Sequence, residues 1–267
     1  MTIALKRAGK SERRVRRRHQ HRFTMAPPPR FFARLALTES STPLVRRLVF
    51  SREDALPMAF TPGQWINIFL PIPGAAAPLR RAYSIASSPR ADGTFELAVT
   101  RVSGGAGSTF LHELSPGSVL EAEGPQGFFS RSQWATSPTL FVATGTGFTP
   151  LRSMLLAAVE ARATSPVHLI LGARHEEDLL YRAELESLTR ACSWFHLTLT
   201  LSQGSASWAG PRGYVQTHVT TALAGLTPHG PPHVYACGLQ RMVSAVRELV
   251  RKDLGLPREQ MHSERFD

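Results

Sequence analysis

The chain has 267 residues, of which 42% are hydrophobic and 19% charged, the composition of an ordinary globular protein. This length predicts two domains of roughly 100–150 residues each. No apolar stretch approaches the roughly 18–20 residues that a membrane-spanning helix requires, so we expect no integral membrane segment. The net charge of +11 is uneven, because residues 1–24 hold nine Lys or Arg against one acid and leave only +3 to the rest.

The basic N-terminal segment, residues 1–29, is expected to be a solvated, disordered extension, because charged blocks of this kind rarely join a core. Its Arg-rich, acid-poor composition also fits a transit peptide, or a segment that binds nucleic acid or anionic lipid. The +3 of the remaining chain offers no basic platform for nucleic acid, so we expect no such partner. We expect a cytoplasmic location, with targeting to an organelle by the basic segment as the alternative.

Short strands separated by Pro and Gly follow the basic segment, from residue 30 to residue 132. The expected strands are Phe31–Leu37, Leu44–Ser51, Gln64–Leu70 and Thr94–Arg101. Turn signals such as Pro62-Gly63 and Asp92-Gly93 fall between them, and one helix, Ser108–Leu114, interrupts the series. Regular spacing of this kind predicts a small antiparallel β-barrel.

The sequence pattern changes from short strands to alternating strands and helices between Ser130 and Pro138, where we expect the domain boundary. The second domain is expected to comprise residues 138–267. Continuous apolar runs are expected to be buried strands: Thr139–Ala143, Val167–Leu171, Phe195–Leu201 and His233–Ala236. Helices are expected between and after them: Pro150–Ala163, Leu179–Arg190, a helix near Tyr214–Leu223, and Leu239–Leu254. Alternating strands and helices predict an α/β domain with a parallel sheet.

A glycine-bearing run opens the first helix of this second domain. Gly145, Thr146 and Gly147 directly follow an apolar strand, where a tight turn can bring bare backbone N–H groups against a phosphate. Thr149 is expected to cap the helix and Pro150 to occupy its first position. The alternative is a plain strand-to-helix turn. Because Pro150 stands where a third glycine would be, this is not the Gly-x-Gly-x-x-Gly fingerprint.

The first domain carries two further candidate groups. Arg81 and Tyr83 lie on one face of a strand and Ser84 on the other. An arginine can pair with a phosphate, and an aromatic ring can stack on a flat ring system. The run Gly104–Ser108 precedes a helix and offers a second anion site. The alternatives are core packing for the tyrosine, a surface ion pair for the arginine and a hairpin for the glycines.

The two cysteines, Cys192 and Cys237, have neither a metal-ligand spacing nor a disulfide pattern, and the histidines show no metal spacing either. Two cysteines cannot hold a four-cysteine iron–sulfur cluster, so we expect no metal in this chain. Without its neighbours, Cys237 at a strand end would be a small buried hydrophobe.

Taken together, the ordered motifs resemble those of the ferredoxin–NADP reductase family of flavoproteins. They are Arg81-x-Tyr83-Ser84, Gly105-x-x-Ser108, Gly145-Thr146-Gly147-x-Thr149-Pro150, Cys237-Gly238 with Met242, and Glu264-Arg265-Phe266. The resemblance covers about residues 30 to 267. It implies a flavin-binding antiparallel barrel followed by a pyridine-nucleotide-binding α/β domain, with FAD or FMN as the cofactor and NADH or NADPH as the co-substrate.

The resemblance also implies a role for each matching residue. Arg81 would pair with a flavin phosphate, Tyr83 would stack on the isoalloxazine and Ser84 would hydrogen-bond near flavin N5. The flavin phosphate would be held by Gly105, Gly107 and Ser108, and the dinucleotide by Gly145, Thr146 and Gly147 with Thr149 and Pro150. Beside the nicotinamide would lie Cys237 and Gly238. At the edge of the active site would lie Glu264 and Phe266. Relatives often end in an aromatic residue, whereas here Asp267 follows Phe266.

The expected function is therefore that of an FAD-containing NAD(P)H oxidoreductase. Its electrons would pass to a separate small iron–sulfur protein, a flavodoxin or an oxygenase component. Two alternatives remain: a reductase of free flavin or another small acceptor, and a non-catalytic subunit that docks on a larger complex. A yellow protein that reduces ferricyanide with NAD(P)H would favour the two enzymatic hypotheses, and a yellow protein without this activity would favour the regulatory subunit.

The sequence favours NADH over NADPH, since selection for NADPH requires cations around the 2′-phosphate. Gln203, after the third strand of the second domain, has no charge to offer. Arg174, after the second strand, is followed by three acidic residues, and Arg212 is the remaining candidate.

Overall fold

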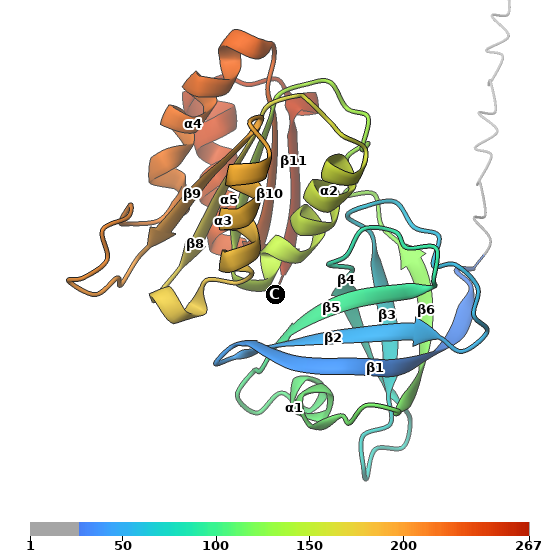
Figure 1. The fold of residues 1–267 in the computed structure, drawn as a ribbon. Coiled ribbons are helices and arrows are strands. Elements are labelled where there is room, and N and C mark those ends of the chain that lie inside the picture. The colour runs from blue at the N-terminus through green and yellow to red at the C-terminus, as the bar shows by residue number, and fades with distance from the viewer. Residues whose placement is uncertain (1–26, 267) are drawn as a thin grey trace, which may run out of the picture.

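The computed structural model describes residues 27–266, which form a β-barrel followed by an α/β unit (Figure 1). The basic segment that we expect to be disordered lies outside the described residues except for its last three, and so does Asp267. Within residues 27–266, no helix combines the length and apolar character that a bilayer span needs.

The first unit, called the barrel below, is a six-stranded antiparallel sheet in the order β4-β3-β6-β1-β2-β5. Its strands are β1 (Arg30–Thr42), β2 (Val45–Arg52), β3 (Trp65–Leu70), β4 (Leu79–Ser84), β5 (Thr94–Thr100) and β6 (Val119–Gln126), with the helix α1 (Ala106–Glu113). A backbone hydrogen bond from Ala86 N to Glu96 O brings the chain after β4 to the other edge strand, β5. The antiparallel barrel expected from the sequence is therefore confirmed.

Strand alternation builds the barrel core. In β1, Phe31, Ala33 and Leu35 are buried while Phe32 between them is 59% exposed. The residues after Leu37 are all polar, so the apolar signal stops there, yet backbone pairing with β2 extends the strand to Thr42. Strand β6 is absent from the expected set because Gly124-Pro125 within it has the composition of a turn.

The second unit, called the α/β unit below, has a parallel sheet in the order β11-β10-β7-β8-β9. Its strands are β7 (Thr139–Thr144), β8 (Val167–Ala173), β9 (Phe195–Leu201), β10 (His233–Leu239) and β11 (Met261–Phe266). Phe141 and Ala143 of β7 pack with one pair of helices, α2 (Phe148–Glu160) and α3 (Arg182–Ala191). Leu140 and Val142 pack with the other pair, α4 (Val219–Leu226) and α5 (Gln240–Glu248). Both faces of the sheet are covered, as expected.

Several helix starts differ from the sequence expectation, and those of α2 and α3 have a clear local cause. Helix α2 begins at Phe148 rather than Pro150, because a 3₁₀ turn over Gly145–Gly147 leads directly into it. Helix α3 begins at Arg182 rather than Leu179, because Tyr181 takes a left-handed backbone conformation with φ of 57°. Strand β11 is also missing from the expected strands; four of its six residues are polar, which hides the apolar pattern of a strand.

The carboxyl ends of the parallel strands lie toward the barrel, and β11 ends between the two units (Figure 1). One direct contact at this place joins Thr100 Oγ1, at the end of β5, to Thr146 Oγ1 in the 3₁₀ turn after β7, at 3.2 Å. Ligands of open parallel sheets bind at this edge of the strands. The fold therefore places the predicted motifs of both units beside one another.

Replacing Phe95 with alanine should destabilise the barrel strongly. The ring is fully buried, stacked on Phe50 at 5.6 Å and edge-on to Phe31 at 6.1 Å. Loss of such a side chain removes apolar burial and leaves a cavity, which costs about 3–5 kcal/mol. Urea unfolding followed by circular dichroism measures the change. The matched control is Phe128→Ala, at an 88% exposed ring, which should shift stability by less than about 0.5 kcal/mol; equal effects would contradict the core assignment.

Candidate active site between the barrel and the α/β unit

The turn after β7 lies in tight contact with the end of β10. A Cβ atom on Gly147 would lie 2.4 Å from Cys237 O and 2.5 Å from Gly238 Cα, so only glycine permits this approach. Gly145 has φ of 53°, a left-handed conformation that glycine adopts without strain. The predicted dinucleotide loop and the predicted nicotinamide residues are thus one contiguous structure.

The start of α2 differs in detail from the expected cap. Thr149 is the second residue of the helix, and its Oγ1 donates a hydrogen bond to Thr146 O at 2.8 Å instead of accepting one. The expectation of a threonine cap is therefore wrong: Gly147 stands at the cap position, without a side-chain hydrogen bond. Pro150 falls in the first turn, where its missing N–H breaks no helical hydrogen bond. The N–H of Phe148, the first in the helix, already donates to Gly145 O and Thr146 O, so the N–H groups at the start of the preceding 3₁₀ turn are the ones that can face an anion.

Thr144 Oγ1 is a buried hydroxyl that has no hydrogen-bond partner among the described residues. It lies at the carboxyl end of β7, 2.8 Å from the position that a Cβ of Gly238 would take. A Cβ on Gly238, whose φ is 144°, would also lie 2.9 Å from Met242 Cε, so only glycine fits at this crowded place. A buried polar atom without a partner calls for an explanation, and a ligand group beside Gly238 supplies one. Sequence reasoning missed Thr144, although its place at the end of a buried strand was the available signal.

Ser84, Cys237 and Glu264 meet across the boundary of the two units. Ser84 ends β4, and its Oγ donates a hydrogen bond to Glu264 Oε1 at 3.3 Å, across 180 residues of sequence. Glu264 in β11 stands directly opposite Cys237 in the parallel pairing with β10. The structure therefore brings together all three residues that the sequence nominated as catalytic.

Burial sets the protonation of this group. It raises the pKa of Glu264 to about 7, an effect that the hydrogen bond from Ser84 only partly opposes. Burial, and secondly the Glu264 carboxylate, raise the pKa of the Cys237 thiol well above its ordinary value. The thiol stays protonated and fully buried, which suits a small uncharged wall and not a nucleophile. Glu264 can hold or release a proton near neutral pH.

On the barrel side, Arg81 and Tyr83 lie beside the start of α1. The Arg81 side chain is exposed, and its Cγ lies 3.3 Å from the position that a Cβ of Gly107 would take. Tyr83 packs against the barrel core, and burial raises its pKa to about 12, so the phenol stays neutral. Ser84, the next residue, is buried on the other face of β4. An exposed guanidinium next to the first turn of a helix is a suitable site for a phosphate.

The Ser108 hydroxyl holds the loop together. Its Oγ accepts a hydrogen bond from Val102 N at 3.0 Å and donates to Gly105 O at 3.0 Å. A Cβ on Gly105 would lie 2.8 Å from this oxygen, so the turn is tight. A bound phosphate would therefore meet the backbone N–H groups at the start of α1, with Gly107 leaving room for Arg81.

Phe266 is partly buried at the end of β11 and packs against the core shared with α2 and α3. In the parallel pairing it stands opposite Leu239, the last residue of β10. The ring therefore lies at the edge of the sheet where Glu264 faces Ser84.

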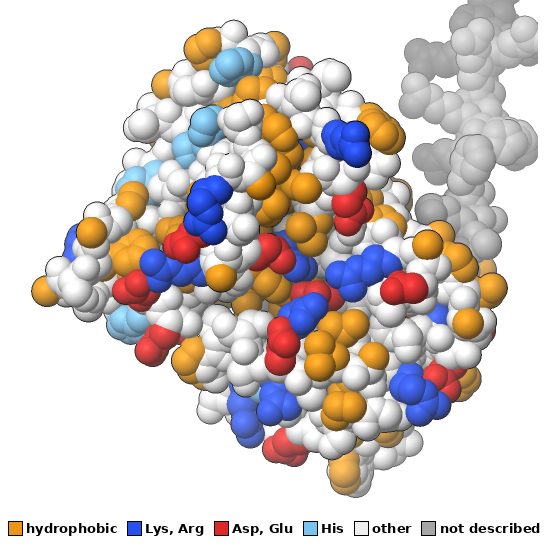
Figure 2. Space-filling model, viewed as in Figure 1, with side chains coloured by type: hydrophobic (Ala, Val, Ile, Leu, Met, Phe, Trp, Pro, Cys, Tyr) orange, Lys and Arg blue, Asp and Glu red, His pale blue; other side chains and the backbone are white. Residues whose placement is uncertain are grey.

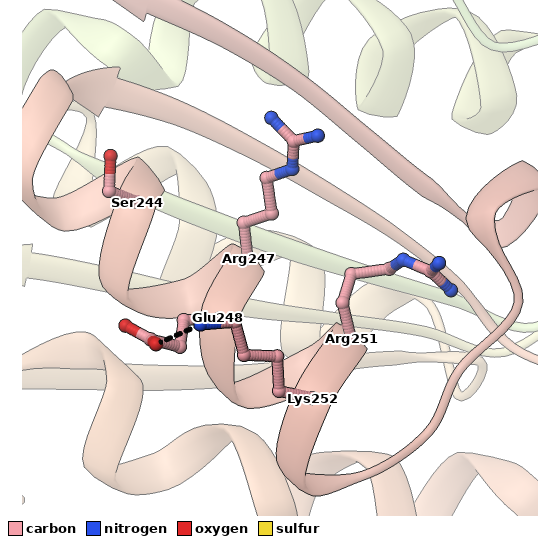
Figure 3. Close-up of a pocket in the computed structure, with 5 residues that line it drawn as sticks. All are labelled: Ser244, Arg247, Glu248, Arg251 and Lys252. Carbon is pink, nitrogen blue, oxygen red and sulfur yellow. Dashed lines mark hydrogen bonds and ion pairs between the residues drawn. The ribbon is translucent and has the colours of Figure 1, made fainter.

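A pocket of about 400 Å³ lies on the surface of α5 and the turn after it (Figure 3). Its lining is mostly charged and comprises Ser244, Arg247, Glu248, Arg251 and Lys252. Lys252 pairs with Glu248 at 2.6 Å, one turn earlier on the helix. None of the residues nominated from the sequence lines this pocket, so we assign it no part in the site.

The raised pKa of Glu264 predicts a pH-dependent stability that Glu264→Gln abolishes. The folded chain holds a proton between pH of about 4.5 and about 7 that the unfolded chain has already released, so stability falls as pH rises through this window. Between about pH 4.5 and pH 8, the free energy of unfolding of the wild type should fall by on the order of 2 kcal/mol more than that of the variant. Urea unfolding at both pH values measures this. Glu259→Gln, at an exposed carboxyl, is the control. If the stability of Glu264→Gln fell between the two pH values as much as that of the wild type, the raised pKa of Glu264 would be contradicted.

The sequence matches two domain families. Residues 33–130 match the family described as oxidoreductase FAD-binding domain, and residues 141–248 match the oxidoreductase NAD-binding domain. The chain is 52% identical to Ferredoxin--NADP reductase B of Sorangium cellulosum, over 89% of this chain and 98% of that protein. It is 30% identical to the glycine betaine monooxygenase reductase subunit of Pseudomonas aeruginosa over 83% of this chain, and spans 60% of that longer protein.

Solved structures share the fold. A ferredoxin NADP+ reductase from Neisseria gonorrhoeae with bound FAD and NADP superposes with a TM-score of 0.74 at 21% identity, covering 88% of this chain and 98% of that one. The ferredoxin reductase in carbazole 1,9a-dioxygenase gives a TM-score of 0.75 at 25% identity, over 91% of this chain and 70% of that one. The matched domains, the relative aligned over its whole length and the shared fold agree with the ordered motifs. The chain belongs to the ferredoxin–NADP reductase family and has its FAD-binding and NAD-binding domains.

Proposed function

We propose that this oxidoreductase moves a hydride from NADPH to bound FAD and passes the electrons to a separate ferredoxin. When bound, FAD would supply a hydride acceptor that can pass its electrons on one at a time. The observation that carries the proposal is the Ser84–Glu264 hydrogen bond, which joins the barrel to the carboxyl edge of the parallel sheet. We propose residues 30–132 and 138–267 as the two domains.

The geometry supports a binding role for each group of residues. Arg81 and the N–H groups beside Gly105 and Gly107 would hold the flavin phosphates, and Tyr83 would stack on the ring system. The turn Gly145–Gly147 and the start of α2, with Thr149 and Pro150, would hold the dinucleotide pyrophosphate. The unpartnered Thr144 hydroxyl, beside a glycine that carries no side chain, supports a place for the nicotinamide carboxamide.

Ser84, Glu264 and Cys237 would then act on the reacting rings by placement. Ser84 has a hydroxyl that can donate to a flavin nitrogen when it leaves Glu264. Glu264, with its pKa near 7, would hold the proton that exchanges at this place. Cys237 would supply a small neutral surface beside nicotinamide C4, and Phe266 would limit the access of water.

The NADPH preference that we propose departs from the sequence expectation and is supported by Arg174. This residue follows β8, is exposed, and among the described residues its guanidinium makes no hydrogen bond or ion pair. Its carbonyl accepts a hydrogen bond from Gln203 N at 2.9 Å, which places it beside the loop after β9.

Two of the three acidic side chains that follow Arg174 have partners of their own. The Glu176 carboxylate pairs with Arg182, and Asp178 Oδ2 accepts the N–H of His175 at 3.2 Å. The other candidate, Arg212, donates to the carbonyls of its own loop at Gly204, Ser205 and Trp208. Arg174 is therefore the cation that remains for a 2′-phosphate. The name of the 52% identical relative, a ferredoxin–NADP reductase, supports the same donor and the ferredoxin acceptor.

The purified protein should be yellow, release FAD on denaturation, and reduce ferricyanide and a ferredoxin with NADPH. Ser84→Ala and Cys237→Ala should keep the flavin but slow hydride transfer, by up to about 100-fold, because both act on the relative placement of the rings. Stopped-flow bleaching of the flavin absorbance measures the rate. Arg81→Ala should instead lower flavin content, since it removes a charged phosphate contact. A colourless protein, or wild-type hydride transfer in both Ser84→Ala and Cys237→Ala, would contradict the proposal.

Arg174→Ala should lower kcat/KM for NADPH by about 10–100-fold, the value of one lost charged hydrogen bond, while kcat/KM for NADH stays unchanged. Steady-state kinetics with both donors measures the change. Arg190→Ala is the matched control, because Arg190 is an exposed arginine in the last turn of α3. This turn leads into the start of β9 and therefore lies at the amino ends of the parallel strands, away from Arg174. A tenfold preference of the wild type for NADH would reverse the assignment.

A further inference from the structure

A buried arginine spans the boundary between the two units. Arg152 in α2 is 4% exposed, and its Nη1 donates to Ala86 O at 2.8 Å and to Glu96 Oε1 at 3.1 Å, both in the barrel. Its other nitrogens donate to the Glu184 carboxylate at 2.7 and 2.5 Å, within the α/β unit. One guanidinium is therefore divided between a carboxylate of its own unit and a carboxylate of the other.

Glu96 is fully buried although it lies in the middle of a barrel strand, β5. Tyr181 Oη donates to Glu96 Oε1 at 2.7 Å, and Arg47 Nε lies 2.8 Å from Glu96 Oε2. The Arg152 guanidinium also lies over the Tyr181 ring, 3.9 Å from its centre. A buried carboxylate needs such partners, because an unpaired one is very unfavourable in a low dielectric. We call Glu96, Arg152 and Tyr181 the interdomain clasp.

Tyr181 takes part in the clasp at a conformational cost. Its φ of 57° is left-handed, a region that bulky side chains rarely occupy. Immediately before α3 begins, the ring lies against the Arg152 guanidinium and its hydroxyl reaches Glu96. Strain of this kind persists only where the surroundings enforce it, and it concentrates at functional sites.

The clasp lies between the two halves of the proposed site. Ala86, which accepts from Arg152, is two residues beyond Ser84. Arg152 itself lies in the helix that opens directly after the Gly145–Gly147 turn. A second contact, in which Ser153 Oγ donates to Ser87 O at 2.7 Å, also crosses the boundary between the two units, which we call the seam. The residues that would position the flavin and the residues that would hold the dinucleotide are therefore joined through one buried side chain.

The clasp lies beside a groove of about 490 Å³ that residues of both units line, among them Arg47, Arg152 and Tyr181. On this face, positively charged side chains lie beside negatively charged ones along the boundary between the two units (Figure 2). Most of these surface pairs are exposed and contribute little, whereas Glu96 and Arg152 are buried and directional.

We propose that the interdomain clasp sets the orientation of the α/β unit on the barrel, and that Glu96, Arg152 and Tyr181 are positioning residues for hydride transfer. The catalytic part of this inference rests on the proposed function. Because hydride transfer depends steeply on the distance and angle between the two rings, a small rotation about the seam lowers its rate while each unit still binds its own nucleotide.

Two variants test the clasp. Glu96→Gln removes the charge that Arg152 and Arg47 share, and Tyr181→Phe removes one hydroxyl and nothing else. Hydride transfer at saturating NADPH should fall about 100-fold in the first and about tenfold in the second, while flavin content and the Kd for 2′,5′-ADP stay unchanged. The long-wavelength absorbance of a stacked nicotinamide–flavin pair should weaken in both.

Glu184→Gln is the matched control. It removes the other carboxylate of Arg152, but this pair lies within the α/β unit and does not cross the seam. Its hydride-transfer rate should stay within about threefold of the wild type. A fall as large as that of Glu96→Gln would overturn the proposal, since the effect would then come from Arg152 and not from the crossing contact.

Small-angle X-ray scattering provides a readout that does not depend on activity. Glu96→Gln and Tyr181→Phe should give a broader distribution of distances between the units, while Glu184→Gln superposes on the wild type. If Glu96→Gln fails to fold, Tyr181→Phe decides. Wild-type scattering and wild-type hydride transfer in Tyr181→Phe would overturn the proposal. If the wild type is not reduced by NADPH, the proposed function fails, and the scattering alone still decides whether the clasp orients the units.

Discussion

The close approach of the turn after β7 to the end of β10 is the constraint on which the site depends. Gly147 lies against Cys237 and Gly238 with no room for a side chain, so the turn that we propose for the dinucleotide and the residues that we propose for the nicotinamide keep one fixed relation. Parallel pairing then fixes Glu264 opposite Cys237. The α/β unit therefore presents a preformed edge, and the remaining variable is how this edge meets the barrel.

That meeting is made by polar groups buried in a seam. Ser84 with Glu264 and Glu96 with Arg152 both cross it, and the carboxylate is partly buried in the first pair and fully buried in the second. Such contacts add little net stability, because desolvation offsets their attraction, but they tolerate only a narrow range of geometry. Their directional character suits a reaction that needs two rings at one distance. The seam thus determines placement, while the two apolar cores supply most of the stability.

The fold class could be predicted from the sequence because its signals are local. Alternation in β1, continuous apolar runs in β7 and β8, and glycine before α2 each lie within a few residues. The order of the motifs predicts the residues of the site. It does not predict the Ser84–Glu264 contact, because the two residues are 180 positions apart and no local sequence pattern connects them. In β5, alternation marks Glu96 as solvent-facing, yet the α/β unit covers that face and buries it.

The place of β11 in the sheet also has a consequence for biosynthesis. A ribosome makes a chain from its N-terminus, so β7, at the centre of the parallel sheet, is available long before β11, which pairs only at the edge with β10. The barrel and four parallel strands can assemble while the last segment is still being made. Glu264 reaches Ser84 only when that segment docks. A nascent chain that lacks β11 thus has the other four strands of the parallel sheet without the Glu264 carboxyl, so the contact between the two units at Ser84 forms only after β11 has been made and has paired with β10.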